Sequence, residues 1–89
     1  MLSLDDAKNV VEQNVSGQGL DVIAGVPYKN LYVFVVGDRT NRNLTIMDPF
    51  RSVDKDSGYF DAFALFKDAT DPEALVNALN AEIKNQGLT

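Results

Sequence analysis

The chain has 89 residues, of which 45% are hydrophobic and 24% are charged, and its net charge is −5 at neutral pH. These proportions are typical of one globular domain and exclude a disordered or fibrous chain, while the acidic balance argues against a general nucleic-acid binder, which needs a basic surface. The sequence contains no cysteine and no histidine, and its residues show neither the pattern expected of a signal peptide nor a long apolar run. We therefore expect a single domain over residues 1–89, located in the cytoplasm, with no disulfide, no cofactor and no membrane span.

The first predicted element is a helix that begins after Ser3. Ser3 is a favourable N-cap, and Asp6 stands where the side chain of a capping box reaches back. An apolar stripe at three- and four-residue spacing follows, formed by Leu4, Ala7, Val11 and Val15. Gly17 and Gly19 then end the helix. A phosphate-binding loop is not favoured there, because such loops follow a strand and this pair of glycines follows a helix.

An apolar run at residues 31–36 is the centre of the predicted fold. It contains no polar side chain on either face of a strand, so we expect a central strand that is covered on both faces. Residues 20–26 predict a short strand that lies nearer the edge of the sheet than the central strand. Residues 27–30 begin with proline and end with asparagine, which predicts a turn that pairs these two strands antiparallel.

A second hairpin is predicted after the central strand. Residues 37–43 are rich in Gly, Asp and Asn and predict a turn, and residues 44–47 resume an extended pattern. Asp48 and Pro49 interrupt the ladder, because proline lacks an N–H donor, so we expect a bend before the strand continues through residues 50–53.

Residues 54–58, with the sequence Asp-Lys-Asp-Ser-Gly, predict a tight turn. The following segment, residues 59–66, fits two patterns. Alternation of Phe60, Ala62 and Ala64 is typical of a strand, whereas the spacing of Phe60, Phe63 and Ala64 also fits a helical turn. We favour a strand that runs to about Phe63 and is followed by an irregular link.

The last predicted element is a helix over residues 72–86. Thr70 or Asp71 is its N-cap, Pro72 is tolerated in the first turn, and Glu73 completes a T-x-x-E capping pattern with Thr70. Its apolar stripe consists of Leu75, Leu79 and Ile83.

These elements predict an α+β domain, in which a helix, three or four antiparallel strands and a second helix follow one another. We expect both helices to lie on one face of the sheet and the other face to be partly open. Tyr28, Tyr32 and Tyr59 are candidates for partner contacts on that open face, because amphipathic aromatic side chains are enriched at interfaces.

Candidate catalytic and metal-binding groups are few. Asp54 and Asp56 supply two carboxylates, but the EF-hand pattern would continue with glycine and glutamate where this chain has Tyr59 and Leu65. We therefore favour a hairpin turn with Asx-type hydrogen bonds over a divalent-cation site. A general acid and base pair of Asp48 and Asp61 lacks a His, Cys or Lys partner at motif spacing. The sequence thus predicts no catalytic, cofactor-binding or metal-binding residue.

The three arginines Arg39, Arg42 and Arg51 lie on or beside the second hairpin. Residues 29–51 carry a net charge of +2, which leaves −7 on the rest of the chain. Guanidinium groups bind carboxylates or phosphates through two hydrogen bonds, so these arginines are candidates for binding a partner. The alternative is that they only keep a solvent-exposed loop soluble.

A family resemblance rests on three motifs, which are Ala-Lys-Asn-Val-Val at residues 7–11, Tyr-Val-Phe-Val at residues 32–35 and Val-Asp-Lys-Asp-Ser-Gly at residues 53–58. The order resembles small bacterial α+β domains with A-K-x-x-V, an aromatic strand and V-D-x-x-T-G. Immunity-type proteins, PepSY-like inhibitory domains and uncharacterised prophage proteins look like this. The resemblance covers about two thirds of the chain. This chain has serine in place of the usual threonine and Asp-Pro-Phe before the turn, and no functional residue is transferred.

We expect a non-catalytic intracellular protein that binds another protein, such as an immunity or inhibitor-like factor or a prophage accessory protein. No nucleic acid or membrane partner is expected. One alternative is an oligomeric structural or assembly component, built as a homodimer through the last helix or an unpaired strand edge. The other is a binder of a small ligand or a divalent cation, which would require a concave pocket lined with polar groups.

Overall fold

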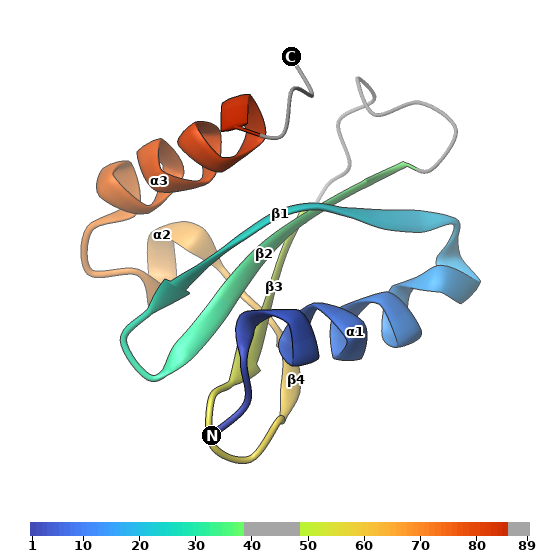
Figure 1. The fold of residues 1–89 in the computed structure, drawn as a ribbon. Coiled ribbons are helices and arrows are strands. Elements are labelled where there is room, and N and C mark those ends of the chain that lie inside the picture. The colour runs from blue at the N-terminus through green and yellow to red at the C-terminus, as the bar shows by residue number, and fades with distance from the viewer. Residues whose placement is uncertain (39–48, 86–89) are drawn as a thin grey trace.

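A four-stranded antiparallel sheet with a helix at each end of the chain forms the core of the computed structural model, which describes residues 1–38 and 49–85 (Figure 1). In chain order the elements are α1 (Leu4–Val15), the short 3₁₀ helix η1 (Ser16–Gln18), β1 (Leu20–Tyr28), β2 (Leu31–Asp38), β3 (Phe50–Asp54), β4 (Phe60–Ala62), α2 (Leu65–Asp68) and α3 (Pro72–Asn85). The strands lie in the order β1-β2-β3-β4, and each is antiparallel to its neighbour. The predicted α+β class and the order of the elements are therefore confirmed.

Helix α1 begins with the predicted capping box. The backbone N–H of Asp6 donates to Ser3 Oγ (3.1 Å), and the backbone N–H of Ser3 donates to Asp6 Oδ2 (3.5 Å). Ala7, Val11 and Val15 of the predicted stripe are buried against the sheet. These contacts fix the position of α1 at the start of the chain.

The two long helices cover opposite faces of the sheet, which corrects the expectation that both lie on one face (Figure 1). One hydrophobic cluster joins α1 to Phe34 and Val36 of β2. The other joins Val33 of β2 to Leu75 and Leu79 of α3. Successive side chains of a strand point to opposite faces, so a central strand that is apolar throughout needs a covering layer on each side.

Strand β2 occupies the predicted central position between β1 and β3. Its predicted partner at residues 44–47, together with Asp48, lies outside the described residues. On the side of β2 away from β1, the described partner is β3 (Phe50–Asp54), and Val36 N–H donates to the Pro49 carbonyl just before it (2.8 Å). The expected strand at residues 50–53 is therefore confirmed.

A β-bulge divides β1 between the two hydrophobic clusters. The register to β2 shifts between Val22 and Ala24. Val22 consequently packs in the cluster under α1, whereas Ala24 and Val26 pack in the cluster under α3. Without the extra residue, the period of two would place all three side chains on one face.

The turn between β1 and β2 is shorter than predicted, because β1 continues through Pro27 to Tyr28. Only two residues, Lys29 and Asn30, connect the strands. Lys29 adopts a positive φ angle (53°) in this turn.

The ambiguous segment at residues 59–66 contains both kinds of structure. Residues Phe60–Ala62 form β4, and a single helical turn follows as α2 (Leu65–Asp68). Asp68 stabilises this turn, since its carboxylate accepts a hydrogen bond from the backbone N–H of Ala64 (3.0 Å). The expected strand is thus confirmed, while the expected irregular link is an ordered turn.

Helix α3 begins after Asp71, one of the two predicted caps. Asp71 Oδ1 accepts a hydrogen bond from the backbone N–H of Ala74 (3.1 Å). Thr70 instead pairs with Tyr28, because the Tyr28 hydroxyl lies 2.9 Å from Thr70 Oγ1 and accepts from the Thr70 backbone N–H (2.8 Å). The described part of the chain contains no helix with the length and apolar character that a membrane span requires.

Candidate functional site

The three candidate tyrosines do not share a surface. Tyr28 packs in the cluster under α3, and its hydrogen bond with the Thr70 side chain lowers the pKa of its hydroxyl. Tyr32 packs under α1, where its hydroxyl donates to the Leu2 carbonyl (2.9 Å) and the Lys55 ammonium lies 5.2 Å from its ring centroid. Tyr59 is 67% exposed. The first two side chains therefore stabilise the fold, and a role of the three in partner binding stays a prediction.

The arginine cluster is described only at Arg51, because Arg39 and Arg42 lie outside the described residues. Arg51 belongs to β3, and its guanidinium donates to the Phe50 carbonyl (2.9 Å). A common binding surface for the three arginines therefore stays a prediction.

The Asp54 turn has the predicted Asx-type hydrogen bonds. Asp54 Oδ1 accepts from the backbone N–H groups of Asp56 (2.9 Å) and Ser57 (2.8 Å), and its Oδ2 accepts from the side-chain amide of Asn30 (3.1 Å). Gly58 follows with a φ of 74°, a conformation that favours glycine. Both carboxylate oxygens of Asp54 thus accept hydrogen bonds within or beside the turn. Within residues 1–38 and 49–85, no three His, Cys, Asp or Glu side chains come close enough together to hold a metal ion.

We expect Asp54→Asn to remove part of the pH dependence of folding. The hydrogen bonds from Ser57 and Asp56 hold the pKa of Asp54 below its ordinary value of 3.8. A lowered carboxyl pKa stabilises the fold fully above that ordinary value, and this contribution is lost as pH falls below it through the folded-state pKa. Urea unfolding from about pH 7 to about pH 3 should show the difference between wild type and variant shrinking in acid. Asp56→Asn, which removes a charge from the same turn without removing these acceptors, should show no such change.

Strand β1 is one of the two edge strands of the sheet formed by the described residues, so some of its backbone groups point away from β2. The backbone N–H of Val36 points toward β3. The backbone groups of successive residues in a strand point in opposite directions, so those of Val33 and Val35 point toward β1. Their partners on β1 are Val26 and Ala24. The residue between these two, Gly25, therefore presents its N–H and C=O to the free edge. One step further, Pro27 presents only a carbonyl, which is the position where an edge strand tolerates proline.

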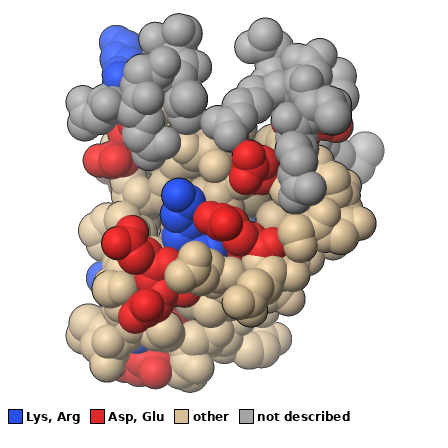
Figure 2. Space-filling view, turned by 45° about the vertical axis from the view of Figure 1, so that its right-hand side comes forward, with Lys and Arg blue, Asp and Glu red and all other residues tan. Residues whose placement is uncertain are grey.

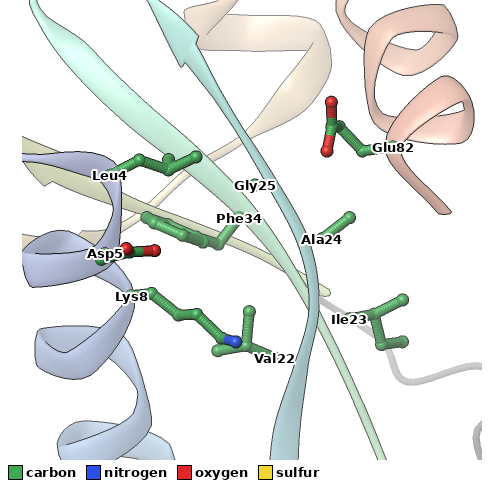
Figure 3. Close-up of a pocket in the computed structure, with 9 residues that line it drawn as sticks. All are labelled: Leu4, Asp5, Lys8, Val22, Ile23, Ala24, Gly25, Phe34 and Glu82. Atoms are coloured by element: carbon green, nitrogen blue, oxygen red, sulfur yellow. The ribbon is translucent and has the colours of Figure 1, made fainter. Parts of the chain in front are cut away.

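A small pocket surrounds this edge at Gly25 (Figure 3). Leu4, Asp5 and Lys8 extend from α1 on one side of β1, and Glu82 extends from α3 on the other. The pocket has a volume of about 120 Å³, which is below the range of about 300–1,000 Å³ typical of small-molecule sites. It has room for one side chain of a partner.

Gly25 cannot be replaced by a larger residue without rearrangement. A Cβ atom built on it would collide with the ring of Phe34, its partner across the β1–β2 pair. The Phe34 ring is buried and fills the space beside the glycine. At this point the edge therefore has no side chain, and the Phe34 ring packs against its backbone.

Three charged side chains line the pocket, and two of them are acidic. Asp5 and Glu82 line it together with Lys8, whose ammonium forms an ion pair with Glu12 (3.8 Å). Among the described residues, Glu82 has no hydrogen-bond or ion-pair partner although its side chain is partly buried. On the face of the molecule shown in Figure 2, acidic side chains lie on both sides of a basic group, and most of the remaining described surface is uncharged.

Sequence reasoning missed this edge site. It identified β1 as an edge strand but singled out neither Gly25 nor Glu82, because α3 brings Glu82 to β1 only in the folded chain. The one available signal was a glycine two residues before a proline in an edge strand, a pattern that marks a close backbone approach. In the comparisons with known proteins, no family model, no curated protein and no solved structure matches this chain.

Proposed function

We propose that this protein is a non-catalytic interaction domain that binds an extended segment of another protein along the free edge of β1. The observation that carries the proposal is the partly exposed edge backbone at Gly25, which lies between α1 and α3. A bound segment would extend the sheet by one strand, and main-chain hydrogen bonds would supply much of its affinity. An immunity or inhibitor-like role, as the sequence resemblance implies, would follow if the segment belonged to the protein that is inhibited.

The covered faces of the sheet support an edge site over a face site. Helices α1 and α3 occupy opposite faces, and Tyr28 and Tyr32 are engaged in intramolecular hydrogen bonds. The opposite edge strand, β4, has only three residues, whereas β1 has nine. Strand β1 therefore offers the longer edge for pairing.

A homodimer through the same edge is the second candidate. Two copies could pair their β1 strands into one continuous sheet. Each copy carries a net charge of −5 and acidic side chains beside the edge, so this contact would bring like charges together. Sedimentation equilibrium should show a monomer at high protein concentration. A dimer whose Gly25 amide is protected from exchange would favour the assembly function instead.

Selection of linear peptides from a random displayed library, followed by amide NMR of the complex, tests the binding function. We expect selected peptides to shift and protect the Gly25 amide and its neighbours in β1, because this N–H would become hydrogen-bonded. The amides of β4 serve as the internal control and should not change. A library that yields no binder, or binders that map away from β1, would contradict the proposal.

A further inference from the structure

We infer that the segment bound at β1 carries a lysine or arginine that pairs with Glu82, next to an apolar side chain that packs against Leu4. The inference rests on the edge pairing proposed above and adds the chemistry of the partner. It is carried by the register of β1, by the position of Glu82 and by the charges of the pocket walls.

The register determines which wall each partner side chain would meet. Residues directly opposite each other on paired strands place their side chains on the same face. A Cβ atom on Gly25 would point at the Phe34 ring, which packs in the cluster under α1. Gly25 therefore faces α1. The partner residue opposite Gly25 would therefore point toward Leu4. The residues before and after it would point to the α3 face, where Glu82 extends toward the edge (Figure 3).

The size and lining of the pocket favour a single apolar side chain on the α1 face. Leu4 is 36% exposed, and it lines the pocket together with Val22 and the Phe34 ring. A volume of about 120 Å³ is suited to a side chain such as valine or leucine. Burial of such a side chain would remove apolar surface from water on both partners.

Charge on the α3 face favours a cation. Glu82 is partly buried and has no partner within the described part of the chain, so a lysine or arginine that reaches it would replace lost hydration with an ion pair. On the α1 side, Asp5 and Lys8 carry opposite charges, so the three charged side chains that line the pocket have a net charge of −1. The edge is therefore complementary to a basic extended segment of another protein and repels an acidic one.

Short peptides of defined sequence test this inference. Acetyl-Thr-Lys-Val-Lys-Thr-amide can place its valine opposite Gly25 and both lysines toward Glu82, and a matched peptide has glutamate in place of each lysine. We expect NMR titration to show the lysine peptide binding at least about fivefold more tightly than the glutamate peptide. Glu82→Gln should weaken binding of the lysine peptide by about three- to tenfold. Glu73→Gln, the same change in the first turn of α3, should leave it unaltered.

A third peptide separates this inference from the proposed function. Methylation of the valine nitrogen removes the donor to the Gly25 carbonyl, and we expect it to weaken binding by about tenfold. If methylation weakens binding but Glu82→Gln does not, the cationic partner is wrong and the edge pairing stands. If methylation has no effect, the edge pairing itself is wrong. If the lysine peptide binds no better than the glutamate peptide, or neither binds, the inference is overturned, and the library selection alone decides the proposed function.

Discussion

Gly25→Ala should destabilise the fold by about 2–3 kcal/mol, because its new methyl group would occupy the position of the Phe34 ring. Phe34 is 1% exposed and is packed between the sheet and α1, so its ring has little freedom to move. The free energy of unfolding, measured by urea denaturation, would show the loss. In a Phe34→Leu background the same glycine substitution should cost less than about 1 kcal/mol, since the smaller side chain leaves room.

Gly37→Ala is the matched control for this result. A Cβ at Gly37 would meet only the terminal Cδ1 atom of Ile23, at 2.6 Å, and this end of the side chain can rotate away. We expect a cost below about 1 kcal/mol. Equal losses at Gly25 and Gly37, or a full loss at Gly25 in the Phe34→Leu background, would show that the ring does not set the requirement for glycine.

Leu79→Ala should cost about 2–5 kcal/mol, since Leu79 is 2% exposed and anchors α3 to the sheet. Asn80→Ala, at the next and exposed position of the helix, should change the free energy of unfolding by less than about 0.5 kcal/mol. Urea denaturation followed by circular dichroism would measure both variants.

Combining Leu79→Ala with Val11→Ala tests whether the helices lie on opposite faces. Val11 belongs to the cluster under α1 and Leu79 to the cluster under α3, so the two losses should add to within about 0.5 kcal/mol. Substantial coupling between them would indicate a shared core and would contradict the placement of the helices.

Much of the architecture could be predicted from local patterns. The capping box at Ser3 and the Asx turn at Asp54 depend on hydrogen bonds within a few residues, and both are confirmed. The apolar run in β2 correctly predicted a strand covered on both faces. A strand that is apolar on both faces needs a covering layer on each side of the sheet, so the expectation that both helices lie on one face was wrong.

The remaining features depend on contacts that no local pattern encodes. The period of two in β1 predicts that its apolar side chains share one face of the sheet. The bulge after Val22 changes the face to which the following side chains point, so β1 supplies apolar side chains to both α1 and α3. Thr70 fits the capping pattern with Glu73, yet its hydroxyl lies 2.9 Å from the Tyr28 hydroxyl, which the fold brings beside it. The edge site escaped prediction for the same reason, since Glu82 and Leu4 flank Gly25 only after the helices have packed.

The path of the chain after β4 has a consequence for how the protein could fail. Helix α3 does not stay beside β4 but returns to pack on β1, the strand that α1 already covers from the other side. The first and the last helix of the described chain thus pack on opposite faces of the same strand. Loss of either helix contact would expose apolar side chains of β1, an edge strand of the sheet, and an exposed apolar edge strand is a template for aggregation.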